Sequence, residues 1–139
     1  MDILEKLNAA MAYIEANLRD EIDVREAARL ALSTPDSFLR FFSYMTGMSL
    51  AEYVRRRRLS LAAEDLRRGA QVVDAAVMYG YDSAAAFSRA FVRQHGITPG
   101  EYKRVGGPLS IYPPASFRIN VLGARKMDLS IIRLDELNV

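Results

Sequence analysis

The chain contains the same segment twice. When residues 38–55 (FLRFFSYMTGMSLAEYVR) are aligned with residues 87–104 (FSRAFVRQHGITPGEYKR), an offset of 49 positions, 7 of the 18 pairs are identical. The identities include two phenylalanines, the arginine between them, a glycine and a Glu-Tyr pair. Such a repeat indicates two copies of one structural unit.

Each copy has the pattern of a helix-turn-helix. A short alanine-rich helix precedes a longer helix that carries Phe-x-Arg-x-Phe, which predicts one motif over about residues 23–47 and a second over about residues 72–96. In the first copy, Phe38 and Phe42 are four residues apart and share one helix face, which we expect to be core rather than a base-stacking surface. Arg40, and Arg89 in the second copy, then point outward, where a base-reading side chain lies in a major groove.

Helix-start and helix-stop signals complete an all-α fold of about seven helices. A first helix is expected over about 3–18, and a long linker helix over about 49–68, opened by Ser49 and Glu52 and closed by Gly69. In the first motif we expect one helix that ends near residue 32 and a second over 35–44. In the second motif we expect helices over 74–79 and 83–95, and a last helix is expected over 99–104. Residues 1–104 are therefore expected to form two helix-turn-helix subdomains joined by the long helix.

The long helix contains four consecutive arginines in EYVRRRR, residues 52–58. Because successive helical residues are ~100° apart, these arginines fan over ~300° and do not form one basic patch. The apolar face changes side along the helix, from Leu50 and Tyr53 to a stretch between Leu59 and Leu66, so we expect the first half to pack on one subdomain and the second half on the other. The helix would span ~28 Å, close to the ~34 Å between successive major-groove turns.

Composition and charge argue against several other functions. The whole chain has 19 Lys and Arg against 17 Asp and Glu, but residues 1–32 carry 4 against 7 and residues 33–104 carry 11 against 7. The absence of cysteine and the single histidine exclude thiolate sites and argue against a metal site, a cofactor or an enzyme. No apolar run approaches the ~20 residues that span a bilayer, so we expect a cytoplasmic protein with no membrane contact.

The composition changes after Arg104. Residues 105–116 (VGGPLSIYPPAS) are rich in glycine and proline and predict a linker. In the tail, 117–139, Phe117, Ile119 and Val121 alternate with polar residues, as do residues 127, 129 and 131, which predicts two strands. Two lone strands are marginally stable, so the tail is either loosely attached or exchanges a strand with a second chain to form a dimer.

Two stretches, FLRFFSYMTGMSLAEYVRRRRLSLAAEDL and GYDSAAAFSRAFVRQHGITPGEYKR, resemble the DNA-binding region of the AraC/XylS family of bacterial transcription regulators. The resemblance covers about residues 4–104. It implies seven helices and two recognition helices that read successive major-groove segments of double-stranded DNA. It implies base or backbone contacts from Thr34, Pro35, Asp36, Leu39, Arg40, Ser83, Ala84, Ala85, Ser88 and Arg89. It also implies a structural pairing role for Arg58 and a phosphate contact from Arg55 or Arg56.

Alternatives remain open beside this resemblance. Considered without the repeat, Arg40 and Arg89 would each be an ordinary solvated or ion-paired arginine on a helix surface. Leu39, Ala84 and Ala85 donate no hydrogen bonds, which fits a protein-interaction module that binds RNA polymerase or another regulator. KMDLSIIRLDELNV resembles the opening strand of a GyrI-like effector-binding domain, so we expect the chain to be an N-terminal fragment of a longer regulator. We expect the DNA-binding part to be a monomer that also contacts RNA polymerase.

Overall fold

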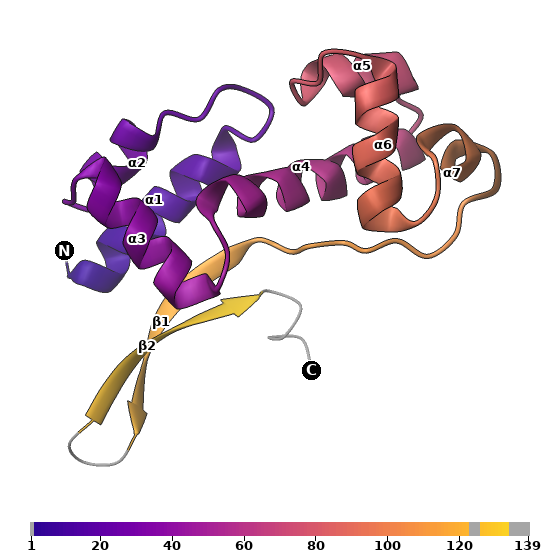
Figure 1. The fold of residues 1–139 in the computed structure, drawn as a ribbon. Coiled ribbons are helices and arrows are strands. Elements are labelled where there is room, and N and C mark those ends of the chain that lie inside the picture. The colour runs from indigo at the N-terminus through magenta and orange to yellow at the C-terminus, as the bar shows by residue number, and fades with distance from the viewer. Residues whose placement is uncertain (1, 123–125, 134–139) are drawn as a thin grey trace. The chain divides into compact units, whose positions relative to one another are not determined.

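A computed structural model describes residues 2–122 and 126–133, with side-chain surroundings up to residue 117. Within these residues the chain forms seven helices followed by a two-stranded antiparallel sheet (Figure 1). The helices are α1 (Ile3–Ala16), α2 (Val24–Leu30), α3 (Pro35–Thr46), α4 (Leu50–Arg67), α5 (Val72–Met78), α6 (Ala84–His95) and α7 (Pro99–Val105). The strands are β1 (Ala115–Leu122) and β2 (Lys126–Arg133). The predicted all-α fold with a C-terminal extension of β character is confirmed.

The chain divides into two compact units, and the boundary falls inside α4. Unit 1 comprises the described residues of Met1–Asn17, Ile22–Tyr53 and Pro113–Val139, and unit 2 comprises Leu18–Glu21 and Val54–Tyr112. The predicted change of buried face occurs at this boundary. Leu50 and Tyr53 are buried in unit 1, whereas Leu59 to Leu66 contribute the buried face of α4 in unit 2.

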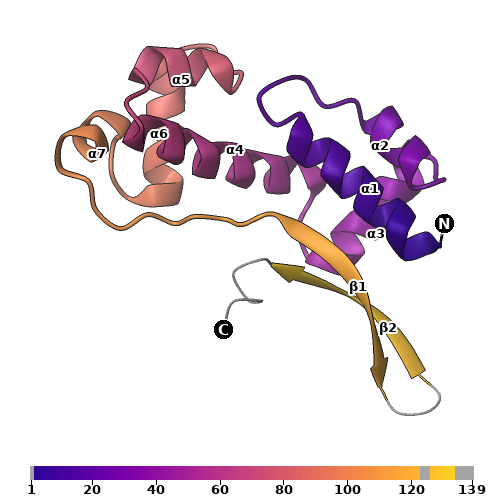
Figure 2. The same ribbon diagram turned by 180° about the vertical axis from the view of Figure 1, so that it is seen from behind.

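Unit 1 is built around α1, α2 and α3, which lie together in both views (Figures 1 and 2). Its centre is aromatic: the ring of Phe42 meets the ring of Tyr53 edge-on, with centroids 5.4 Å apart. The buried Tyr53 hydroxyl donates to the Glu15 carboxylate at 3.0 Å and accepts from the Ala115 amide at 3.0 Å. Because both bonds are made, the tyrosine is buried without an unpaired polar atom.

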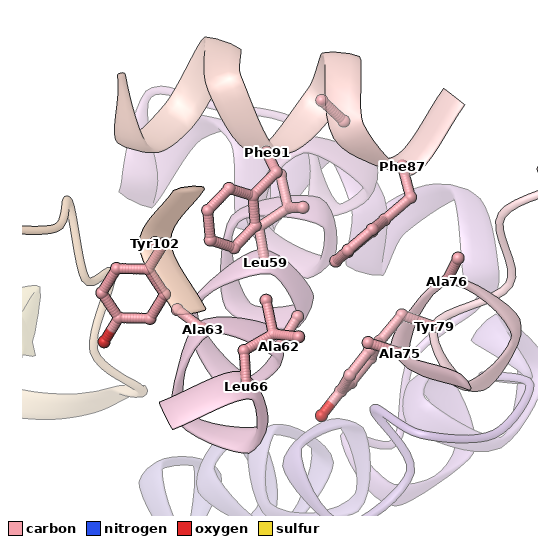
Figure 3. Packing of buried hydrophobic residues seen from close by; sticks show 11 residues of the cluster. Leu59, Ala62, Ala63, Leu66, Ala75, Ala76, Tyr79, Phe87, Phe91 and Tyr102 are labelled. Atoms are coloured by element: carbon pink, nitrogen blue, oxygen red, sulfur yellow. The ribbon is translucent and has the colours of Figure 1, made fainter. Parts of the chain in front are cut away.

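The core of unit 2 is a cluster of residues from four helical segments. In Figure 3, Phe87 and Phe91 point from α6 toward Leu59 and Ala62 of α4. Small side chains line much of this contact, so the helices approach closely and the aromatic rings fill the remaining space. The cluster consists of Leu59, Ala62, Ala63, Leu66, Ala75, Ala76, Tyr79, Phe87, Ala90, Phe91 and Tyr102.

The two helix-turn-helix turns share one backbone geometry. After α2, Ser33 N–H donates to the Ala28 carbonyl at 2.9 Å, and after α5, Tyr81 N–H donates to the Ala76 carbonyl at 2.9 Å. The residue before each donor has a left-handed backbone, with φ 52° at Leu32 and 81° at Gly80. The second turn has one more residue before its helix, so Ala28 corresponds to Ala76 at an offset of 48 rather than 49.

Several helix ends differ from the predicted ones by one or two residues. α1 ends at Ala16 rather than near residue 18, because Asn17 leaves the helical conformation and its side chain donates to the Tyr13 carbonyl at 2.8 Å. α3 continues to Thr46, two residues beyond the predicted end, until Gly47 adopts a left-handed backbone. Local side-chain and glycine geometry decides these ends.

Most of the segment predicted as a linker is bound to unit 2. The Arg57 guanidinium donates to the Tyr112 carbonyl at 2.6 Å, and Tyr112 N–H donates to Ser60 Oγ at 2.7 Å. Ser110, two residues before Tyr112, is held in the same way. Its carbonyl accepts from the Gln94 side-chain amide at 3.1 Å, and its N–H donates to the His95 ring. Side chains of α4 and α6 thus take the place of a neighbouring strand for residues 110–112.

The tail forms the predicted pair of strands, and its first residues pack on unit 1. In the register of β1 and β2, Phe117 faces Ile131, Ile119 faces Leu129 and Val121 faces Met127. β1 begins at Ala115, two residues before the predicted strand, and the Asn8 side chain bonds both the N–H and the carbonyl of Phe117, at 2.7 and 2.8 Å.

The likeness of residues 126–139 to a GyrI-like domain stays a prediction. Its last part, residues 134–139, lies outside the described residues. A tail-mediated dimer is likewise a prediction. Among the helices that the structure describes, none combines the length and the apolar character that crossing a membrane requires.

Candidate nucleic-acid interface

Thr34 and Ser83 start the two candidate recognition helices in the same way. The Thr34 hydroxyl accepts from Ser37 N–H at 3.2 Å, and the Ser83 hydroxyl accepts from Ala86 N–H at 3.0 Å. Pro35 occupies the first turn of α3, where its missing N–H costs nothing. These predicted site residues thus first fix where each helix begins, and both helix N-termini present further backbone amides without intrahelical acceptors.

The phenylalanines point inward and the arginines outward, as predicted. Phe38 and Phe42 in α3, and Phe87 and Phe91 in α6, are fully buried. The two arginines between these pairs lie on the exposed faces of their helices. The predicted core role of the phenylalanines is therefore confirmed, and bases do not reach these buried rings.

Arg40 carries an ion pair on its own helix. Its Nη2 lies 2.8 Å from Oδ2 of Asp36, one helical turn earlier, with 75% and 80% of the two side chains exposed. An exposed pair of this kind contributes less than about 1 kcal/mol to stability. Arg89 has Ala85 at the equivalent place, and in the part of the chain that the structure describes it forms no ion pair.

The remaining predicted contact residues offer little hydrogen bonding. Leu39 and Ala85 are exposed, and Ala84 and Ser88 are partly buried. Ser88 is the only one of these four with a polar side chain. Hydrogen-bond donors among the predicted contact residues of α3 and α6 therefore come mainly from the charged side chains.

Sequence reasoning missed Tyr44 and Arg93. Each lies one turn after the central arginine of its helix and is exposed, Tyr44 to 86%. They are aligned with each other in the repeat, so the same 49-residue offset and the helical period would have identified them. They lengthen the exposed face that each candidate recognition helix presents.

The four arginines of α4 are largely used inside unit 2. Arg58 donates to the carbonyls of Leu18 and Asp20, both at 2.8 Å, which confirms its predicted structural role. Arg57, which the sequence did not single out, is buried and holds the Tyr112 carbonyl. The guanidinium carbon of Arg56 lies 5.4 Å from the ring centroid of Tyr112, and Arg55 is half-buried. A phosphate contact from Arg55 or Arg56 stays a prediction.

His95 is a structural residue. Its Nε2 lies 3.0 Å from the Leu59 carbonyl and its Nδ1 accepts from Ser110 N–H at 3.1 Å. Both ring nitrogens are therefore used by the neutral tautomer that carries its proton on Nε2. Burial lowers the pKa of His95, and the bond to Leu59 opposes this only in part. Among the described residues, no group of three or more acidic or histidine side chains is placed to hold a metal ion.

Comparison with known proteins gives matches across both candidate recognition helices. A family profile described as a helix-turn-helix domain matches residues 26–105. The HTH-type transcriptional activator AarP of Providencia stuartii is 34% identical over 98 residues, which cover 70% of this chain and 73% of AarP. The matched residues 26–105 include all of α3 and α6.

Solved structures have a similar fold over about three quarters of this chain. A probable AraC family transcriptional regulator from Rhodopseudomonas palustris CGA009 is 25% identical, with a TM-score of 0.64 over 75% of this chain and 99% of the other. The DNA-binding domain of the global transcriptional factor AdpA, solved in complex with a target DNA, is 27% identical, with a TM-score of 0.57 over 75% of this chain and 92% of the other.

Proposed function

Because the chain belongs to the family of AraC-type helix-turn-helix DNA-binding domains, we propose that it is a sequence-specific, double-stranded-DNA-binding transcription regulator. In this proposal α3 and α6 enter successive major-groove segments. Related proteins support the general class: AarP is named a transcriptional activator, and AdpA was solved with its target DNA.

One observation carries the proposal: an exposed arginine occupies the same position in both copies of the repeat. Arg40 and Arg89 each lie between two buried phenylalanines on the second helix of a helix-turn-helix. An arginine there can donate two hydrogen bonds to O6 and N7 of guanine, which gives ~1–3 kcal/mol of discrimination against other bases. Two such contacts make a short code that DNA shape would supplement.

Backbone contacts would position the two helices. The N-termini of α3 and α6 present backbone amides and a partial positive charge, which suit phosphate oxygens. Thr34, Pro35 and Ser83 lie at these N-termini. Arg55 or Arg56 of α4 would add a phosphate contact. Such contacts hold the protein on DNA without reading sequence.

The test begins with selection of bound duplexes from a random double-stranded library. We expect a motif with two guanine-containing parts about 10 base pairs apart, the spacing of successive major-groove segments. Arg40→Ala should abolish the base preference in one part and Arg89→Ala the preference in the other. Binding curves would be measured by fluorescence anisotropy.

Arg104→Ala is the matched control. Arg104 is an exposed arginine on α7 that is paired with Glu101, outside both recognition helices. The change removes one positive charge, as the other two substitutions do, and should leave the base preference intact. Selection that enriches no motif, or the same uniform weakening in all three variants, would refute the proposal.

A second candidate function is a protein-interaction module. Apolar exposure favours it: Val73, Val77 and Met78 of α5 are all about half exposed or more, and Leu39 and Ala85 are apolar on the candidate DNA face. In this reading the helices bind RNA polymerase or another regulator, and DNA binding is weak and unspecific. A preference for the selected over a scrambled duplex separates the two, because unspecific DNA binding is also electrostatic and also weakens as salt rises.

A further inference from the structure

The two recognition helices differ next to their central arginine. Asp36 in α3 and Ala85 in α6 are aligned by the 49-residue offset and are both exposed. Each is the second residue of its helix, one turn before the arginine. The Asp36 carboxylate lies 2.8 Å from Arg40 Nη2, whereas a methyl group stands at that place beside Arg89. The repeat thus presents the same arginine once with and once without a carboxylate.

This difference changes the charge that each helix offers to DNA. The charged residues of α3 are Asp36 and Arg40, so the helix is neutral overall. α6 contains Arg89 and Arg93 and no acidic residue, and His95 is neutral. Phosphate groups therefore attract α6 more strongly than α3.

The carboxylate leaves Arg40 able to read a base. A guanidinium has five N–H donors, and the ion pair with Asp36 engages Nη2. Donors remain for the two acceptors of a guanine edge. Asp36 holds the Arg40 side chain near one orientation and repels the phosphate oxygens of DNA. Arg40 therefore gains little by turning from a base to a phosphate. Arg89 is free to meet a base or a phosphate.

On the basis of the proposed function, we infer that Asp36 is a positioning residue that makes Arg40 selective for guanine. The first recognition helix then supplies most of the base discrimination, and the second supplies most of the affinity. The two helices of this chain serve as each other's control.

The test exchanges the two residues one at a time, in the full chain. Asp36→Ala should lower the preference for guanine opposite α3 by about 5-fold, the lower end of one bidentate contact's discrimination, because Arg40 remains but then meets phosphates as well as the base. It should also tighten binding to scrambled DNA, and the slope of log K against log salt concentration should become steeper by about one. Ala85→Asp should do the reverse at α6: a stronger preference for its guanine and a salt slope shallower by about one unit.

Glu26→Ala is the matched control for Asp36→Ala. Glu26 lies on α2 and forms an ion pair with Arg29 at 2.6 Å, so the change also removes one acid and one surface ion pair. Its guanine preference should equal that of the native chain. Circular dichroism checks folding, and Ala85→Asp should fold well because an acid in the first turn of a helix is favourable.

Three results would overturn the inference. If Asp36→Ala tightens binding to all DNA equally and keeps its guanine preference, Asp36 acts through charge alone. If Ala85→Asp leaves the preference at α6 unchanged, a carboxylate at this position does not confer selectivity. If the native chain shows no salt-dependent binding to DNA, the proposed function fails, and the inference fails with it. This result is distinct from the other two because it is seen before any substitution is made.

Discussion

At the scale of single residues, Leu32 and Gly80 show one backbone position filled in two ways. Both have a left-handed backbone in the turn of a helix-turn-helix, with φ 52° and 81°. Leu32 has a side chain there that is 71% exposed, so little burial compensates for the strain. A left-handed conformation costs a non-glycine residue ~1–2 kcal/mol.

Substitutions at these two positions should therefore have opposite effects on stability. Leu32→Gly relieves the backbone strain but raises the conformational entropy of the unfolded chain. We expect the net effect to stabilise the fold by up to about 1 kcal/mol. Gly80→Ala should destabilise the fold by about 1 kcal/mol, since no atom crowds the position and only the backbone conformation is penalised. Urea denaturation followed by circular dichroism measures both. A Leu32→Gly variant clearly less stable than the native chain would mean that the side chain makes a contact worth more than the strain.

His95 gives a prediction about pH. Its pKa is lowered by burial, so between its folded pKa and the ordinary value near 6.5 the unfolded chain binds a proton that the folded chain does not. Stability should thus be constant with respect to His95 above about pH 7 and fall as the pH drops below about 6.5. Because the chain has one histidine, NMR titration of its ring protons measures the folded pKa directly. A folded pKa at or above 6.5 would contradict the account.

Residue roles were predictable where periodicity alone decides them. Arg40 and Arg89 were expected to point outward because each lies between two phenylalanines four residues apart, and the structure confirms it. Arg57 was not predictable as a buried residue, because its partner is the carbonyl of Tyr112, 55 residues away. The ion pair of Arg40 with Asp36 follows from four-residue spacing and was also within reach of the sequence.

At the scale of elements, the segment after α7 is held by side chains rather than by a strand. Ser60 is central to this contact: its buried hydroxyl accepts from Tyr112 N–H at 2.7 Å and from Gln94 at 3.2 Å, and donates to the Arg56 carbonyl at 2.8 Å. Composition predicted a linker here because glycine and proline set local conformation. It did not reveal binding to α4 and α6, which depends on residues far away in the sequence.

Ser60→Ala should loosen this segment. The change removes the acceptor of the partly buried Tyr112 N–H, which should cost about 1 kcal/mol, the lower end of the range for an unpaired buried donor. We expect that loss in the free energy of unfolding and faster hydrogen exchange at the Tyr112 amide. Ser43→Ala, at an exposed serine of α3, is the control and should change stability by less than about 0.5 kcal/mol. Unchanged exchange at Tyr112 would show that Ser60 does not hold the segment.

Helix starts were more predictable than helix ends. Thr34, Ser83 and Thr98 all cap their helices, and a hydroxyl three residues before an amide is a signal that the local sequence carries. The β-hairpin was predicted from alternation, but the bonds from Asn8 to Phe117 join residues 109 positions apart. Such bonds require the fold itself.

At the scale of the whole molecule, the chain is one motif built twice. Each unit holds a candidate recognition helix by a pair of buried phenylalanines and presents an arginine on the exposed face of that helix. The repeat predicted this architecture, because identities at core and turn positions survive where surface residues diverge. It did not predict which copy contributes more to affinity or to selectivity, since that depends on the residues that differ between the copies.

The central claim is that these two arginines read DNA sequence, and one measurement tests it most directly. Affinities for the selected duplex and for a scrambled duplex would be compared at several salt concentrations, for the native chain and for the Arg40→Ala, Arg89→Ala double variant. The native chain should prefer the selected duplex and lose affinity for both as salt rises. The double variant should lose most of that preference while it keeps salt-dependent binding to the scrambled duplex. A double variant that still prefers the selected duplex as strongly as the native chain would contradict the account.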